Sequence, residues 1–495
     1  MGCTMQKRIP AVLSLAVLAA GSGGASAGEW TGAYIGIGGG YGAAVHELSF
    51  SNGPAIPAPP AFGVSLDGLG GDGGFFTLGV GADYQVNSNF VVGAFFDYDW
   101  TSLETDIGGS LALGGDSGSA NLSLEVEDQW SIGGRAGYLV TPSTLLFLTA
   151  GYTDVDVSDL TLRLTIGDVS DGGVVAGIGS FSGYFLGGGA EVKLTEAVSL
   201  KAEYRYTDLD AERISLLPGS GIDEFVTTKL DPDIQTARVT LNYRFGAGDR
   251  SEPETQVAEA AAPASWTGFY LGVGGGYAFA NNELSLSDGP AIPDDVAFNV
   301  GIDGLGGQGG AFTVGGGADY QFAPKFVIGA FVDYTRHNAS TDINAGITDG
   351  IDSLGANIGF DIEDEISVGA RLGYLANSRT LLYGTVGYSA VDISDARVSV
   401  SIDGFPLFNE VLARNGDFSG YFLGAGIETK LSDAVSLKLD YRYTDLGSER
   451  VTLLPDVFPE ANDFVTTSLD TDIQTVRLTL NYRFDALREA AAPLK

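Results

Sequence analysis

Charged side chains recur at alternate positions of apolar segments, and they form two matched sets. Each set holds four acidic and four basic residues, so it is neutral, although the whole chain has a formal net charge of −37. The chemistry open to such residues is ion pairing in a confined interior, because a buried unpaired ion is very costly. We predict a structural layer of ion pairs made by Asp83, Asp97, Arg135, Glu191, Lys201, Glu203, Arg205 and Arg238, and again by Asp319, Asp333, Arg371, Glu428, Lys438, Asp440, Arg442 and Arg477.

Residues for other chemistry are scarce. The chain has two histidines, His46 and His337, and one cysteine, Cys3, which lies in an N-terminal segment predicted to be removed. The histidines fall at non-equivalent places in the two repeats described below, which disfavours nucleophilic catalysis and haem ligation. The acidic Gly-rich stretch 67–72 lacks the oxygen spacing of a calcium loop. We predict no enzymatic activity, no cofactor and no dedicated metal site.

Two copies of one unit must position the charges. Residues 30–34 (WTGAY) return as 266–270 (WTGFY), and 240–245 (TLNYRF) return unchanged as 479–484. The offset between the copies grows from 236 to 239 residues only within stretches rich in Gly, Asp and Ser. Length changes are thus confined to loops, as expected for a duplicated fold.

The order of segments follows from composition. Lys7 and Arg8, the apolar stretch 11–20 and the small residues 25–27 are typical of a secretory signal peptide. The stretch between the repeats is rich in Ala, Pro and Glu, as flexible linkers are. We predict a signal peptide over 1–27, a first barrel repeat over 28–246, a linker over 247–265, a second barrel repeat over 266–484 and a C-terminal tail over 485–495.

Each repeat has a period of two. In 236–245, apolar residues alternate with Thr, Arg and Asn, which is typical of a strand with one apolar and one polar face. Eight such segments, with short connections at 87–89, 141–143 and 195–197 and long ones between them, predict a small transmembrane barrel. The segments in the first repeat are 30–49, 74–87, 90–105, 121–140, 144–165, 180–194, 198–217 and 227–245.

The fold class is therefore all-β, with two tandem eight-stranded antiparallel transmembrane β-barrels. One fused sixteen-stranded barrel is the alternative, although about twenty linker residues are more than an antiparallel turn needs. Inward glycines such as Gly272, Gly274 and Gly276 favour a narrow lumen that has room only for side chains. Aromatic residues at strand ends predict outward girdles: Trp30, Tyr138, Tyr243 and Phe245 at one level, with Tyr98, Trp100 and Trp130 at the other.

Several motifs resemble the opacity-type outer-membrane β-barrel family. They are Trp-Thr-Gly-Ala/Phe-Tyr at 30 and 266, Gly-Tyr-Phe-Leu-Gly at 183 and 420, Lys-x-x-Tyr-Arg-Tyr-Thr-Asp-Leu at 201 and 438, and the closing Asn-Tyr-Arg-Phe. That family includes outer membrane immunogenic and haemin-binding surface proteins and is similar in plan to OmpA/OmpX-type barrels. The resemblance implies the outer membrane of a Gram-negative cell, insertion by the barrel assembly machinery, and often surface antigenicity.

The function expected from these features is non-enzymatic. We expect a structural, surface-exposed envelope component with an ion-pair-filled lumen and acidic extracellular loops. Its partners are expected to be outer-membrane lipid and lipopolysaccharide, with an extracellular ligand or host surface as a further possibility. A porin-like channel and haemin binding are the alternatives. The acidic balance disfavours nucleic acid as a partner.

Overall fold

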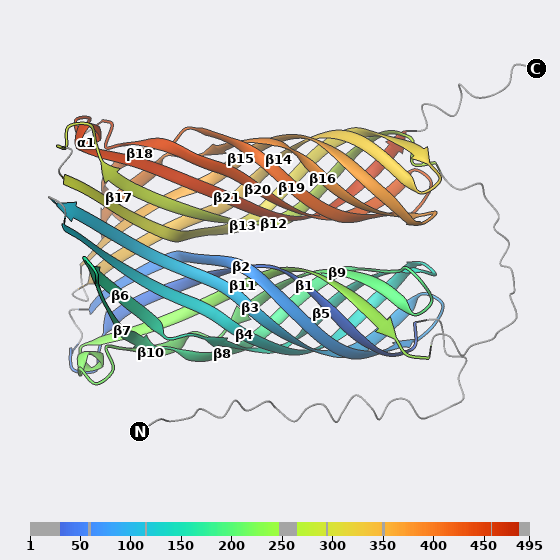
Figure 1. Ribbon diagram of the computed structural model, residues 1–495, viewed down its shortest axis with the longest axis horizontal. Coiled ribbons are helices and arrows are strands. Elements are labelled where there is room, and N and C mark those ends of the chain that lie inside the picture. The colour runs from blue at the N-terminus through green and yellow to red at the C-terminus, as the bar shows by residue number, and fades with distance from the viewer. Residues whose placement is uncertain are drawn as a thin grey trace, which may run out of the picture.

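The computed structural model consists almost entirely of antiparallel strands (Figure 1). It describes residues 30–57, 61–113, 116–246, 265–293, 296–348, 352–456 and 458–484. The predicted signal peptide, the linker up to residue 264 and the predicted tail lie outside the described residues. Within those residues, helices are all too short or too polar to cross a bilayer.

Eight strands of the first repeat close into a barrel. Each strand pairs antiparallel with the next, and the last pairs with the first through partners such as Arg244 and Tyr34. In ring order the strands are β1 (Gly32–Asn52), β2 (Ala61–Gln85), β3 (Phe90–Leu113), β4 (Asp116–Thr141), β5 (Thr144–Val157), β8 (Gly179–Lys193), β9 (Val198–Leu209) and β11 (Val226–Arg244).

The second repeat closes in the same way, with Phe484 of its last strand opposite Phe269 of its first. Its ring is β12 (Gly268–Asp288), β13 (Val296–Ala323), β14 (Phe326–Thr348), β15 (Ser353–Asn377), β16 (Thr380–Ile393), β19 (Asp417–Lys430), β20 (Val435–Leu453) and β21 (Val465–Phe484). Because β11 pairs with β1, and β12 with β21, the two eight-stranded barrels are confirmed.

The two ends of each barrel differ. The three predicted tight turns are confirmed, and they define what we call the turn end. The opposite loop end carries β6 (Leu160–Ile166), β7 (Val169–Gly177), β10 (Glu212–Leu216) and the 3-10 turn η1 (Ile222–Glu224), and in the second repeat β17 (Ala396–Ile402), β18 (Phe405–Arg414) and α1 (Ala461–Phe464). Much of what the sequence predicted as loop is therefore strand, since runs of alternating Ser and aliphatic residues continue the period-two pattern.

Inward and outward sides alternate as predicted. In β11, Arg238 is 2% exposed and Val239 is 50% exposed. The placement of Trp30 in an outward girdle is wrong, because its side chain is fully buried. Position 30 is in phase with the inward Tyr34, so the alternation itself points Trp30 into the lumen.

Inward glycines make the lumen narrow. A Cβ atom built on Gly40 would lie 2.1 Å from the carbonyl oxygen of Ala237 and 2.6 Å from the ring of Phe75. No side chain fits at that distance, so glycine is required for the neighbouring strand and ring to approach. This close packing leaves the remaining interior to long inward side chains.

The barrels lie side by side with their axes nearly parallel and their loop ends together (Figure 1). The contacts are made by equivalent positions of the two repeats. Near the turn end, the hydroxyl oxygens of Thr144 and Thr380 are 2.9 Å apart. Nearer the loop end, the rings of Tyr41 and Tyr443 pack at 6.2 Å, and those of Tyr206 and Tyr277 at 6.3 Å. The chain thus forms an internal two-fold pair of barrels, like a symmetric dimer on one polypeptide.

At the loop end the two rings exchange strands. The start of β2 leaves β3 and pairs with the end of β14, from Ala61–Thr348 to Asp67–Asp342, while the end of β3 pairs with the start of β13. The exchange gives one closed ring of sixteen strands above the two barrels, in the order β1, β2, β14, β15, β17, β18, β20, β21, β12, β13, β3, β4, β6, β7, β10 and β11.

Two glycines allow this merger. A Cβ atom on Gly70 of β2 would lie 2.8 Å from the Cα atom of Gly306 of β13. The two backbones touch at the point where the rings join, so a side chain at either position would push them apart. A sixteen-stranded ring is therefore present at the loop end, but it joins β2 to β14 and β3 to β13 and not the strands on either side of the linker.

The exchange predicts a specific cross-link. Ser65 and Asn344 are register partners on β2 and β14. In a chain with Cys3→Ser, we expect Ser65→Cys with Asn344→Cys to form a disulfide, because neighbouring strands are about 5 Å apart. Cleavage at a protease site engineered into 247–264 should then leave one band on a non-reducing denaturing gel.

The matched control pairs Ser65→Cys with Asn357→Cys, which lies one strand further along. That distance of about 10 Å is too long for a disulfide. Equal cross-linking of both pairs, or separation of the halves in the first, would contradict the exchange.

Candidate functional site

The first group of inward charges lies near the turn end of the first barrel. Arg135 on β4 donates to Asp83 on β2 and, at 2.6 Å, to Glu191 on β8. Arg244 on β11 donates to the same Asp83 at 2.8 Å. Asn242 and Ser199 also donate to Glu191. Donors from three strands therefore converge on two carboxylates from two further strands, and all these side chains are buried.

A second group lies one layer nearer the loop end. Arg205 on β9 is 2.9 Å from Asp97 on β3 and 3.3 Å from Glu203. Lys201 is 3.0 Å from Glu203. Arg238 on β11 is 3.0 Å from Asp99 and 3.7 Å from Asp97. Each charge in this group has at least one opposite charge within 3.3 Å.

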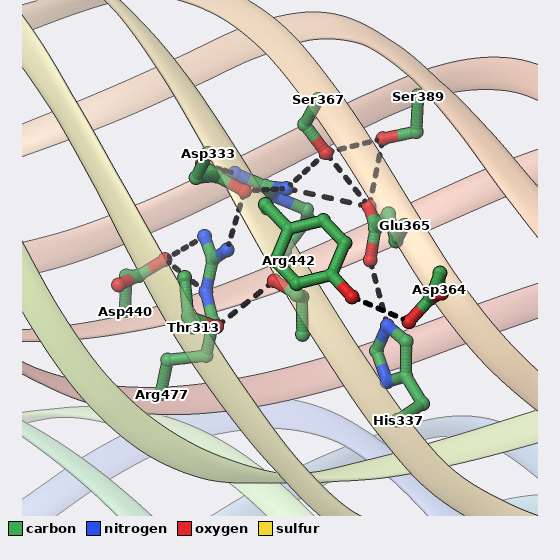
Figure 2. Close-up of polar contacts among 12 residues, drawn as sticks. Thr313, Asp333, His337, Asp364, Glu365, Ser367, Ser389, Asp440, Arg442 and Arg477 are labelled. Carbon is green, nitrogen blue, oxygen red and sulfur yellow. Dashed lines mark hydrogen bonds and ion pairs between the residues drawn. The ribbon is translucent and has the colours of Figure 1, made fainter.

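The second barrel repeats both groups with one change, and Figure 2 shows the group nearer the loop end. Arg371 contacts Asp319 and Glu428, as its counterpart does. In the layer above, Asp333 accepts from Arg442 at 2.8 Å and from Arg477 at 3.1 Å. Asp440 pairs with Arg477 at 2.6 Å and with Lys438 at 3.3 Å. The sixteen residues named from the sequence thus lie in two inward groups per barrel.

Sequence reasoning missed one acid and one base in each barrel. The missed residues are Asp99 and Arg244 in the first barrel, and Glu365 and Arg483 in the second. With them, the two groups in each barrel together hold five acidic and five basic side chains and stay neutral. The alternation of residues in the sequence already predicts that Arg244 and Arg483 point inward. They were left out of the predicted ion-pair layer because that layer was placed further from the turn end.

The fifth acid has moved between the repeats. Asp99 on β3 faces Gln129 on β4, and the equivalent pair in the second barrel is Thr335 on β14 and Glu365 on β15. One carboxylate is kept, but it sits on the other member of the cross-strand pair. Glu365 lies 3.4 Å from Arg442 and 2.9 Å from His337. No single position repeats this acid, so a comparison of the copies position by position could not find it.

Aromatic rings complete the packing around the cations. The guanidinium of Arg205 lies 4.1 Å from the ring centre of Phe185, and Arg442 lies 4.1 Å from Phe422. At the turn end Trp30 closes the lumen: its Nε1 donates to the Pro142 carbonyl at 2.9 Å, and the Arg244 guanidinium lies 5.5 Å from its ring. Trp266 has the same place in the second barrel.

Apolar side chains fill each lumen above the ion pairs. These inward residues belong to the strand ends near the loop end, and they are buried against one another. The first apolar layer contains Ala44, Leu103, Leu124, Val126, Val155, Val157, Ala176, Phe181, Leu209, Ile214, Leu230 and Ile234, and the second contains Ala278, Ala280, Ala339, Ile362, Val391, Ile393, Phe418, Leu446, Val451, Leu469 and Ile473.

The one constellation that suggests catalysis has the wrong order. Glu365 lies between His337 and the hydroxyls of Ser367 and Ser389, so the carboxylate and not the imidazole accepts from both serines (Figure 2). A serine nucleophile needs the base next to its hydroxyl. All four residues are buried, which leaves no room for a substrate. Among the described residues, no three His, Cys, Asp or Glu are grouped to hold a metal ion.

Comparison with known proteins gives a family match over both repeats. The family model described as outer membrane protein beta-barrel domain matches residues 12–245 and 256–484. A 31 kDa outer-membrane immunogenic protein of Brucella melitensis biotype 1 is 29% identical over 239 residues, which are 47% of this chain and 90% of that protein. A 22 kDa outer membrane protein of Rhizobium leguminosarum bv. viciae is 33% identical over 167 residues, which are 32% of this chain and 71% of that protein.

Solved structures with similar folds include the outer membrane protein OprG from Pseudomonas aeruginosa. It is 15% identical, with a TM-score of 0.25, and the match covers 44% of this chain and 97% of that chain.

The moved carboxylate predicts a compensating pair of substitutions. Asp99→Thr removes the closest partner of Arg238 and leaves that cation under-compensated in the lumen. We expect the free energy of unfolding to fall by about 3 kcal/mol. Adding Gln129→Glu reproduces the arrangement of the second barrel and should recover at least about half of that loss. Urea titration, read by the mobility of unboiled protein on gels, measures both.

Glu104→Thr is the matched control, because Glu104 is an exposed acid on the same strand. It should change the free energy of unfolding by less than about 0.5 kcal/mol. A double variant less stable than Asp99→Thr alone would show that the position of the acid matters more than the neutrality of the layer.

Proposed function

This chain belongs to the outer membrane protein beta-barrel domain family, and on that premise we propose that it is a sealed, non-enzymatic structural component of the outer membrane that displays its loop end at the cell surface. The observation that carries the proposal is the filled lumen. From the turn end upward, Trp30 or Trp266, two groups of ion pairs and an apolar layer follow one another in each barrel. Such an interior holds the strands in register and leaves no continuous path for water.

The outer face fits a bilayer. Between the turn end and the aromatic residues Trp100 and Trp130, the outward side chains of the first barrel are apolar or small, and many are about half exposed, such as Leu241 and Tyr243. A closed barrel satisfies its backbone hydrogen bonds internally, as hydrocarbon requires. A slip of one residue would turn Arg238 and Arg244 outward, at a cost of about 2–4 kcal/mol each near the bilayer midplane. The register is therefore strongly specified.

Acidic residues follow directly above this apolar band. Asp128, Asp154 and Asp208 lie on outward positions of β4, β5 and β9, each two residues beyond an outward Trp or Tyr. Carboxylates at this height would meet the phosphates of lipopolysaccharide, with divalent cations between them. For this reason we propose lipopolysaccharide as a partner. Acidic extracellular surfaces would also keep the exposed part of the protein soluble.

Insertion is proposed to use the last strand. β21 ends with outward Tyr482 and Phe484, whose rings pack edge to face with their centres 5.1 Å apart, and the first repeat ends with a Tyr–Phe pair in the same arrangement. An amphipathic strand with an aromatic end is what the barrel assembly machinery is expected to receive. Haemin binding is not favoured, because the buried His46 has no counterpart: the second repeat has Asn282 there.

The sealed lumen predicts the absence of steady conduction. We expect the full chain in planar bilayers to give no stable stepwise current, and liposomes that contain it to resist swelling in sugars of graded size. A general porin tested in parallel is the positive control. Long-lived channels of uniform size, or rapid swelling with the smallest sugars, would favour the porin-like alternative instead.

A further inference from the structure

The sixteen-stranded ring has the opposite polarity to the barrels below it. In β1, Leu48 lies inward and packs against the first apolar layer, whereas the outward positions are Glu47 and Ser49. In the second repeat Leu284 and Phe360 pack inward against the second apolar layer in the same way. The inner face thus changes from charged to apolar, and the outer face from apolar to polar, along single strands.

The strand exchange preserves this polarity across the junction. Val64 of β2 is the register partner of Ala345 of β14, and Phe62 is the partner of Ile347. The inward side of one barrel is therefore joined to the inward side of the other. The register of β3 and β13 joins the inward Gly109 and Val300 in the same manner.

Two walls of the ring have only apolar residues or glycine among their described inward side chains. The first wall is formed by β2, β14, β15 and β17, and the second by β13, β3, β4 and β6. Their inward residues are Phe62, Val64, Ala345, Ile347, Leu354, Ala356, Ile358, Val398, Val400 and Ile402 in the first wall, and Phe298, Val300, Gly109, Gly118, Ala120, Leu122, Leu162, Leu164 and Ile166 in the second.

The outward neighbours on the same strands are polar. Asn357 donates to Asn344 at 2.8 Å on the outside of the first wall, and the hydroxyls of Ser123 and Thr161 are 3.0 Å apart outside the second. This outer face suits water. The walls are therefore not a second membrane-embedded band, and their apolar side is turned toward the enclosed space.

The described residues leave the enclosed space unfilled. Ile347, Leu354 and Ile402 are cross-strand neighbours in the first wall, and their exposed fractions are 50%, 45% and 42%. In the second wall Leu164 is 47% exposed and Ile166 is 75% exposed. Exposed aliphatic clusters of this kind are uncommon on a water-facing surface without a ligand. Below them, the two apolar layers close the floor.

We propose that this shared cup binds small, uncharged, apolar molecules of the hydrocarbon class from the medium. The walls supply aliphatic and aromatic contacts, which fit such a solute. The register also places the carboxylates Asp171, Glu410 and Glu449 inward, on β7, β18 and β20 beside the walls. These acids disfavour anionic amphiphiles such as fatty acids. In the walls, β2, β14, β3 and β13 are paired on both sides, so an added strand from a peptide is not accommodated there.

The cup is made by both repeats together, so duplication creates it. Each wall contains strands from the two repeats, β2 with β14 and β3 with β13. One barrel alone would present half of each wall and an open gap. The inference concerns the space above the barrels and holds whether or not they conduct, so its failure is distinguishable from failure of the proposed function.

The test uses two neighbouring labels on β17 of the full chain in lipid nanodiscs. In the Cys3→Ser background, Val400→Cys places a small fluorophore inside the cup, and Ser399→Cys places it outside. The probe is 1-bromonaphthalene, an uncharged heavy-atom quencher. We expect saturable quenching at position 400 and only weak, non-saturating quenching at position 399.

Wall variants test where the probe binds. Ile347→Asp with Leu354→Asp should raise the half-saturating probe concentration at position 400 by at least about tenfold, because charge is placed against the ligand. If that chain does not fold, Ile347→Thr with Leu354→Thr places a β-branched residue, which favours strands, at both positions and should weaken binding in the same direction. Unboiled gel mobility shows that each variant is folded.

Three results would overturn the proposal. The first is equal or non-saturating quenching at both labels. The second is a midpoint that the wall variants do not change. The third is a label at position 400 that is shielded from aqueous iodide before any probe is added, in a particle with the mass of two chains, since a second copy would then occupy the cup.

Discussion

The fold depends on the neutrality of a buried, narrow interior. An eight-stranded barrel cannot place an inward ion in bulk water, so an inward charge needs an opposite charge beside it. Arg135 and Arg371 each contact carboxylates from two other strands, and in this way they fix the relative height of three strands at once. Register, strand tilt and the outward apolar face all follow from these contacts, because a slipped strand would break the pairs and turn arginines outward.

The moved carboxylate shows what this constraint keeps constant. Asp99 and Gln129 have become Thr335 and Glu365, while the two groups of each barrel together keep five acids and five bases. The balance of charge within the layer is retained, whereas the strand that supplies it is not. His337 fits the same view, because it contacts Glu365 from a position that holds Thr101 in the first barrel. The lumen therefore behaves as one electrostatic unit in which neighbouring strands can exchange roles.

Most of the barrel could be predicted from the sequence, because a period of two is read directly from alternation. The same alternation predicts that Trp30 points inward. The wrong location came from a weaker rule, that aromatic residues at strand ends form an outward girdle. The longer strands at the loop end were missed because residues such as Gly, Asp and Ser are usual in turns, although here they alternate with aliphatic residues in 62–66 and 398–402. The exchange of β2 with β14 could not be predicted, since it depends on how two distant, equivalent barrels meet at Gly70 and Gly306.

Duplication gives this chain something that a single repeat lacks. Two narrow barrels form the base of the structure. Above the apolar layers, strand ends of one repeat pair with strand ends of the other. At the junction, inward residues of one repeat pair with inward residues of the other, as Val64 does with Ala345. The merged ring therefore keeps an apolar inner face and a polar outer face. A wider ring cannot fill its centre with the side chains that filled two narrow ones, so apolar residues such as Ile347 and Leu354 stay exposed. An open apolar cup above a sealed base is thus a geometric consequence of joining two barrels at one end.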